Sequence, residues 1–263
     1  MPQTDTICDI VAKRKTHGRQ PMGKVVKVGN GFTAFIISKE WRKNKMATAK
    51  ANDVVEIKKR DIKIIPIKIV GDSPLIVHAW SDKAKKMMLD AQRKTTKTKA
   101  KEARDPFDEF INSMYWLTEK PESNPEAFQK AIENGAKFGF PLTGIKQASN
   151  AAALRSGWVK DQVSLRGSYF LSSPYGDNVE IISDSPIMRE DMVRIGNGSA
   201  DLRYRGEFRN WHMEFMMEYN ANGKYTIEQL INCIDAGGYA VGIGEWRPEK
   251  DGMFGRYHIE VDW

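Results

Sequence analysis

The sequence predicts an α+β fold in which antiparallel strands are separated by single helices. Alternation of apolar and polar residues recurs along the chain, and it is clearest in WHMEFMMEY at residues 211–219. Helix signals stand between such runs, for example the capping box formed by Thr226 and Gln229. We therefore predict a ferredoxin-like core of the split βαβ type, with an extended basic loop and a small β-rich segment before it.

The first half of the core is predicted from local signals. Residues 62–70 alternate Ile and Lys up to Gly71, which indicates a half-buried strand that ends in a loop. A helix is expected after Ser81, with Met87 and Met88 on its buried face. A second helix begins at the cap Asp105, with Pro106 in its first turn, and its apolar spacing extends to residue 117.

The second half follows the same logic. Residues 134–141 are typical of a turn and a short strand, and Thr143 opens a helix that ends at Gly157. Strands are expected at residues 163–171 and 179–183, and the run 203–209 leads into the alternating segment 211–219. A helix then opens at Thr226, followed by a glycine-rich hairpin over residues 237–257 and a last strand over residues 256–261.

The N-terminal part is predicted to stand apart from this core. Residues 1–22 are basic and polar, which favours a flexible arm. Residues 23–61 form a small β-rich segment, because two short strand-like runs flank the turn Gly29-Asn30-Gly31. The predicted division is therefore an arm at 1–22, a β-hairpin segment at 23–61 and a binding domain at 62–263.

Charge is distributed unevenly along the chain. Residues 1–104 hold 25 Lys and Arg against 10 Asp and Glu, whereas residues 105–263 hold 16 against 24. The segment RKTTKTKAKEAR at 93–104 has one acidic residue and no large apolar side chain, so it is expected to be a mobile loop unless a ligand orders it. A basic half of this kind favours a polyanionic partner and salt-sensitive binding.

Several functional classes find no support in the sequence. No apolar stretch is long enough to span a membrane, the N-terminus has no secretory pattern, and two cysteines make no disulfide framework, which favours a cytoplasmic protein. We find no phosphate loop, dinucleotide fingerprint, paired-carboxylate or metal-binding pattern, so no cofactor, metal or catalytic residue is assigned. Of the histidines, His78 is the one most suited to acid–base work.

Binding chemistry is better represented. Five arginines between Arg189 and Arg209 alternate with Tyr204, Phe208 and Trp211. Arginine clamps phosphates and stacks on bases, and aromatic rings offer stacking platforms that tolerate any sequence. The glycine-rich segment 237–257 also carries Trp246, which favours a loop that faces a ligand.

Three segments resemble a family of phage and prophage proteins: SPLIVHAWSDKAKKMM, GFPLTGIKQASNAAALRSG and MREDMVRIGNGSADLRYRGEF with the later GYAVGIGEWRPEKDGMFGRYHI. The same order is similar to the RAMP superfamily of CRISPR backbone subunits. The resemblance implies a modified RRM fold, head-to-tail assembly and a grip on single-stranded RNA, with Lys146 and Arg155 at phosphates and the 93–104 loop embracing the strand.

A second resemblance concerns residues 23–61, where KVVKVGNGFTAFIISKEWRKN and NDVVEI are similar to the AbrB/MazE swapped-hairpin domain. It implies a dimer that binds duplex DNA. The chain departs from that pattern at Ser38 and Asn52.

Together these observations predict a non-enzymatic protein that coats or handles single-stranded DNA or RNA, as a homo-oligomer and possibly a filament, in phage replication, recombination or defence. The alternatives are a metal-independent ribonuclease of the RAMP kind that uses His78 or His212, a duplex-DNA regulator acting through residues 23–61, and a structural phage component. The candidate binding residues are Lys94, Lys97, Lys99, Lys101, Lys146, Arg155, Arg194, Arg203, Arg205, Arg209, Trp246, Arg247 and Arg256.

Overall fold

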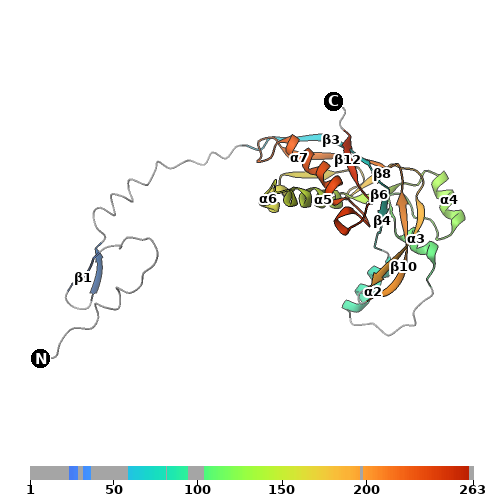
Figure 1. The fold of residues 1–263 in the computed structure, drawn as a ribbon, viewed down its shortest axis with the longest axis horizontal. Coiled ribbons are helices and arrows are strands. Elements are labelled where there is room, and N and C mark those ends of the chain that lie inside the picture. Colours follow the sequence, from blue (N-terminus) through green and yellow to red (C-terminus); the bar gives the residue numbers. More distant parts are fainter. Residues whose placement is uncertain are drawn as a thin grey trace. The chain divides into compact units, whose positions relative to one another are not determined.

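The computed structural model describes residues 24–28, 32–36, 59–80, 82–93, 104–195 and 198–260 (Figure 1). The chain divides into two units, Met1–Ile57 and Lys58–Trp263, here called unit 1 and unit 2. In unit 1, β1 (Lys24–Val28) and β2 (Phe32–Ile36) pair antiparallel, which confirms the two strands of the predicted hairpin. The predicted arm at 1–22 and the lysines at 94, 97, 99 and 101 lie outside the described residues.

Unit 2 is built around a four-stranded antiparallel sheet, here called the main sheet. Its strands lie in the order β12 (Tyr257–Glu260), β3 (Ile62–Gly71), β11 (His212–Asn220) and β7 (Tyr169–Ser172). In chain order, α5 (Leu142–Arg155) comes between β3 and β7, and α7 (Ile227–Ala236) comes between β11 and β12. The predicted mixture of helices and antiparallel sheets is therefore confirmed.

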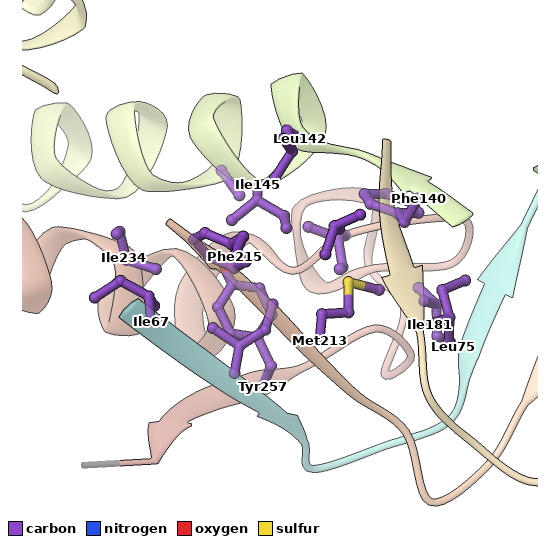
Figure 2. Close-up of a cluster of buried hydrophobic side chains, with 14 of the residues drawn as sticks. Ile67, Leu75, Phe140, Leu142, Ile145, Ile181, Met213, Phe215, Ile234 and Tyr257 are labelled. Atoms are coloured by element: carbon purple, nitrogen blue, oxygen red, sulfur yellow. The ribbon is translucent and has the colours of Figure 1, made fainter. Parts of the chain in front are cut away.

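One face of the main sheet carries the core. Along β11 every second side chain from Met213 to Tyr219 is buried, as the alternation in the sequence predicts. Figure 2 shows Ile145 of α5 and Ile234 of α7 directed toward Ile67 of β3 and Phe215 of β11. Both helices thus cover the same face of the main sheet. The side chains of Ile145 and Ile234 are fully buried there, which stabilises the contact by removing apolar surface from water.

Unit 2 also contains two three-stranded sheets. One consists of β4 (Leu75–Val77), β10 (Ser199–Phe208) and β9 (Ile187–Ile195), and the other of β5 (Tyr115–Trp116), β6 (Phe138–Pro141) and β8 (Asn178–Ile181). The remaining helices are α2 (Asp82–Gln92), α3 (Pro106–Asn112), α4 (Pro125–Glu133) and α6 (Gln162–Arg166). Within the described ranges, no helix is both long and apolar enough to cross a membrane.

Several local predictions are confirmed at their caps. Asp105 caps α3 through a 2.9 Å hydrogen bond from the Phe107 amide, and Pro106 occupies the first turn. Thr226 and Gln229 form the expected capping box at α7. The helix predicted after Thr143 is α5, although it begins one residue earlier, after Pro141.

Four predictions are wrong. The apolar spacing after Asp105 does not extend the helix to 117, because the chain turns at Ser113 and continues as β5. Residues 162–166 are helical rather than extended, since Asp161 caps the amides of Val163 and Ser164.

The glycine-rich hairpin is replaced by the single-turn helices η1 (Gly237–Val241) and η2 (Pro248–Lys250) with tight turns between them. The methionine face of α2 is not core: the Met87 side chain is 65% exposed and that of Met88 is 50% exposed. The helix forms as predicted, but the described part of the chain lays no sheet or helix over that face.

Candidate nucleic-acid interface

An open cleft of about 590 Å³ lies where the chain leaves β4 and enters α2. Aromatic and cationic side chains dominate its wall. It is lined by Ala79, Trp80, Lys85, Asn112, Met114, Tyr115, Trp116, Thr118, Lys120 and Asn178. We call it the Trp80 cleft, because the Trp80 side chain is 62% exposed and is the most accessible ring in the wall.

Backbone pairing brings these distant segments together. The Ala79 amide donates to the Ser113 carbonyl at 2.7 Å, which holds the chain beside Trp80 against the end of α3. The Trp116 side chain is held by a hydrogen bond in which its indole Nε1 donates to the Ile111 carbonyl at 2.9 Å. The wall therefore rests on paired backbone rather than on a free loop.

Two lysines, Lys85 and Lys120, line the cleft. Lys120 Nζ donates to Asn112 Oδ1 at 2.8 Å, and Asn112 in turn donates to the Asp108 carboxylate at 2.9 Å. Lys85 lies on the first turns of α2 with an exposed side chain. Two primary amines at the rim of an aromatic cleft suit a polyanion whose bases can stack.

Glu245 connects the cleft to a set of ion pairs beside it. Burial and then the charge of Glu245 raise the pKa of the Tyr115 phenol. Glu245 Oε1 lies 3.7 Å from His78 Nδ1, and Glu245 Oε2 lies 3.9 Å from Arg205 Nη2. The interaction with His78, and then the charge of Arg205, hold the pKa of Glu245 below its usual value against the opposing effect of burial.

The arginine-rich stretch is largely neutralised by the protein's own carboxylates. Arg189 donates to Asp191 and to Glu207, both at 2.8 Å. Arg205 is 6% exposed and donates to Asp191 at 3.2 Å, and Arg209 donates to Glu207 at 2.7 Å. Burial would raise the pKa of Glu207, but the hydrogen bonds from Arg189 and Arg209 lower it overall.

The other candidate arginines are placed as follows. Arg203 pairs with Asp201 at 2.9 Å, and Arg104 also bonds Asp201. Arg155 and Arg247 share Glu249, with closest distances of 2.5 and 2.7 Å. These pairs make the arginines parts of an internal ionic framework on β10 and the glycine-rich segment.

The last three charged candidates are Arg194, Arg256 and Lys146. Arg194 on β9 is exposed, and the Arg256 guanidinium lies 5.4 Å from the centre of the Tyr239 ring. Lys146 donates to the Tyr169 carbonyl at 2.8 Å, and burial lowers the pKa of its amine. These three side chains do not line the Trp80 cleft.

The glycines of the 237–257 segment serve close packing. A Cβ at Gly244 would lie 2.3 Å from the Ile76 carbonyl oxygen, and one at Gly255 would lie 1.8 Å from that of Ile243. The Glu245 amide donates to the Ile76 carbonyl at 2.9 Å. Gly244 thus allows close approach to β4, and Gly255 allows close packing within the segment itself, while Trp246 is 37% exposed with a φ of 51°.

Sequence reasoning missed Trp80, Tyr115, Trp116, Lys85 and Lys120 as possible binding residues. The available signal was Trp80, a large aromatic residue placed directly before a helix cap with lysines after it. Among the described side chains, no cluster of three or more His, Cys, Asp or Glu is placed to hold a metal ion.

Comparison with known proteins adds no assignment. No protein-family model matches this chain, and a search of curated proteins finds no significant match.

Proposed function

We propose that this chain is a non-enzymatic protein that binds single-stranded nucleic acid, and that the Trp80 cleft takes up bases of the strand. The observation that carries the proposal is the cleft itself, where an exposed indole and two further aromatic residues share the lining with Lys85 and Lys120. Single-strand binding sites combine stacking rings with cations that follow the phosphates.

The electrostatics of unit 2 support this location over the arginine-rich strands. Arg189, Arg203, Arg205 and Arg209 are each paired with a carboxylate, so much of their charge is already offset. The basic sequence 93–104 follows α2 directly in the chain. The exposed side chains of Lys85 and Lys86 on α2 add positive charge that attracts a polyanion to this part of unit 2.

The open face of the main sheet is less suited to a strand. Many single-strand-binding sheets expose aromatic rings and cations there. In this chain that face has one exposed ring, Phe170 with Lys146 over it, and its charged side chains are mainly acidic, at Glu214, Glu218 and Glu260, with Lys68 paired with Glu260. An acidic face repels phosphates, which favours the cleft as the place of contact.

The strand order supports a ferredoxin-like, RRM-like core for unit 2. Numbered along the βαββαβ run of β3, α5, β7, β11, α7 and β12, the main sheet has the order fourth, first, third, second. That order, with every pair antiparallel, is the one expected of the split βαβ fold. The glycine-rich segment between α7 and β12 suits the proposed relation to RAMP proteins and their phage counterparts.

Stacking and phosphate contacts do not distinguish ribose from deoxyribose, so the proposal covers both kinds of strand. The test measures fluorescence anisotropy of labelled single-stranded DNA, single-stranded RNA and duplex DNA of about 20 nucleotides each. Single strands should bind more tightly than the duplex, with affinity falling steeply as salt rises.

A matched pair of variants locates the contact. Lys85→Gln should lower the salt slope by about 0.7 and weaken binding about fivefold at 0.1 M salt, whereas Lys130→Gln on α4 should leave both unchanged. Absence of binding to either single strand would overturn the proposal. Preference for the duplex would replace it with a duplex-DNA regulator, and RNA cleavage that His78→Ala abolishes would replace it with a ribonuclease.

A further inference from the structure

The Trp80 cleft carries neutral polar side chains as well as rings and amines. Its lining includes Asn112, Thr118 and Asn178. Bases present hydrogen-bond donors and acceptors at their edges, so an amide or hydroxyl group beside a stacking ring can distinguish one base from another. Which base the cleft favours therefore depends on which of these three side chains the protein itself leaves unused.

Two of the three are already engaged. The Asn112 Nδ2 donates to the Asp108 carbonyl at 2.8 Å and to the Asp108 carboxylate at 2.9 Å, and Asn112 Oδ1 accepts from Lys120 at 2.8 Å. Thr118 has a single polar atom, Oγ1, which accepts from the Lys137 amide at 3.2 Å. Neither side chain presents an unused donor and an unused acceptor side by side.

Asn178 differs from both, because within the described ranges its carboxamide has no hydrogen-bond partner. It is the first residue of β8, where half-buried and buried side chains alternate, and its own side chain is half-buried. A carboxamide holds an acceptor oxygen and a donor nitrogen next to each other in one plane. Asn178 therefore offers the cleft a paired donor and acceptor.

Strand register places Asn178 on the same side of its sheet as Tyr115. Asn178 of β8 is opposite Pro141 of β6, and Tyr115 of β5 is opposite Gly139 of β6. Residues 139 and 141 of one strand point to the same face, and residues directly opposite each other share a face. Asn178 and Tyr115 thus share one face of the sheet, and both line the cleft.

We propose that Asn178 makes the Trp80 cleft selective for adenine, an inference that rests on the proposed uptake of bases by this cleft. The carboxamide oxygen accepts from the adenine N6 amino group while the carboxamide nitrogen donates to N7, which is the usual pairing of asparagine with this base. Guanine presents two acceptors on the same edge, so it leaves the carboxamide oxygen without a donor. Cytosine and thymine each present one polar group there, so neither forms the pair of bonds.

The test compares oligo(dA) of about 20 nucleotides with the same strand made from 7-deazaadenine. The analogue has carbon in place of N7, so it loses one acceptor and keeps the N6 amino group, the two rings and the phosphates. In anisotropy titrations the wild-type protein should bind oligo(dA) at least about fivefold more tightly than the analogue, which is the lower end of the effect of a bidentate contact.

A matched pair of variants assigns this preference to Asn178. Asn178→Leu keeps the size of the side chain but has no donor or acceptor, so it should bind oligo(dA) and the analogue equally. Asn134→Leu, at the exposed end of α4 and outside the cleft, should keep the wild-type ratio of the two Kd values. Far-UV circular dichroism and thermal melting confirm that each variant is folded.

Asn178→Asp tests the same contact with a different base. A carboxylate only accepts, and it pairs with the cytosine N4 amino group, so the ratio of affinities should shift from oligo(dA) toward oligo(dC). The inference alone is overturned if the wild type binds oligo(dA) and its analogue equally while Trp80→Ala still weakens binding, or if both Asn178 variants keep the wild-type ratio. Absence of binding to all of these strands overturns the proposed function as well.

Discussion

Replacing Trp80 with alanine should weaken strand binding without weakening the fold. The indole is 62% exposed, so its removal takes little buried apolar surface from the folded state. A base that stacks on such a ring contributes about 1–3 kcal/mol to binding. Because about 1.4 kcal/mol corresponds to a tenfold change in Kd, Trp80→Ala should raise Kd between about 5-fold and about 140-fold.

Trp158 provides a matched control, because it is the same residue type, is 57% exposed and lies outside the cleft. Anisotropy titrations of one labelled single strand should show the loss for Trp80→Ala and no loss for Trp158→Ala. Both variants should melt within a few degrees of the wild type. Equal Kd values for Trp80→Ala and wild type, or an equal loss in Trp158→Ala, would refute the stacking argument.

Three predictions concern stability, each measured by urea unfolding. Asp191→Ala should cost about 3 kcal/mol, because it leaves the buried Arg205 guanidinium without its closest charge partner; a cost near zero would contradict that role. Gly255→Ala should lower the free energy of unfolding more than Gly135→Ala does. Both glycines have a positive φ, at 65° and 77°, but of the two only Gly255 has a backbone oxygen within 2 Å of an added Cβ. Equal losses of stability would contradict the close packing at Gly255. The pKa of Glu207 is lowered in the folded state, so the ionised carboxylate stabilises the fold. This contribution to the free energy of unfolding is complete above the unfolded pKa of about 4.3 and is lost as pH falls through the folded pKa. Glu207→Gln should therefore flatten the fall of stability below about pH 5.

The parts of the fold that follow from short-range patterns could be read from the sequence. The alternation along β11 and the capping box at Thr226 each depend on residues within one element. Residues 162–166 show where this fails, since a cap at Asp161 outweighed an apolar run that resembles a strand.

The arginine-rich stretch shows a different limit. Arg189 reaches Glu207 on the paired strand, and Arg205 lies near Glu245 in the glycine-rich segment. Spacing along the chain does not reveal such partners, so a run of arginines and aromatic residues predicts a ligand surface even where most of the arginines pair with the protein's own carboxylates. The sequence does show carboxylates within the same stretch, among them Asp191 and Glu207, which could have indicated that the arginines pair with them.

The candidate site escaped prediction for the same reason. Trp80 and Trp116 are brought together by the Ala79–Ser113 backbone bond and by the end of α3, which no local pattern encodes. The basic surroundings were visible in the composition, but the cleft they border depends on contacts between distant segments.

Photo-crosslinking identifies the residues that touch a bound single strand. A single strand carrying 5-iodouracil at each position is bound, irradiated, digested and mapped by mass spectrometry. If bases of the strand enter the Trp80 cleft, crosslinks should form at Trp80, Tyr115 or Trp116 and be lost under competition by unlabelled single strand. Crosslinks confined to the open face of the main sheet around Phe170 and Met216, or to unit 1, would show that the strand does not bind in the Trp80 cleft.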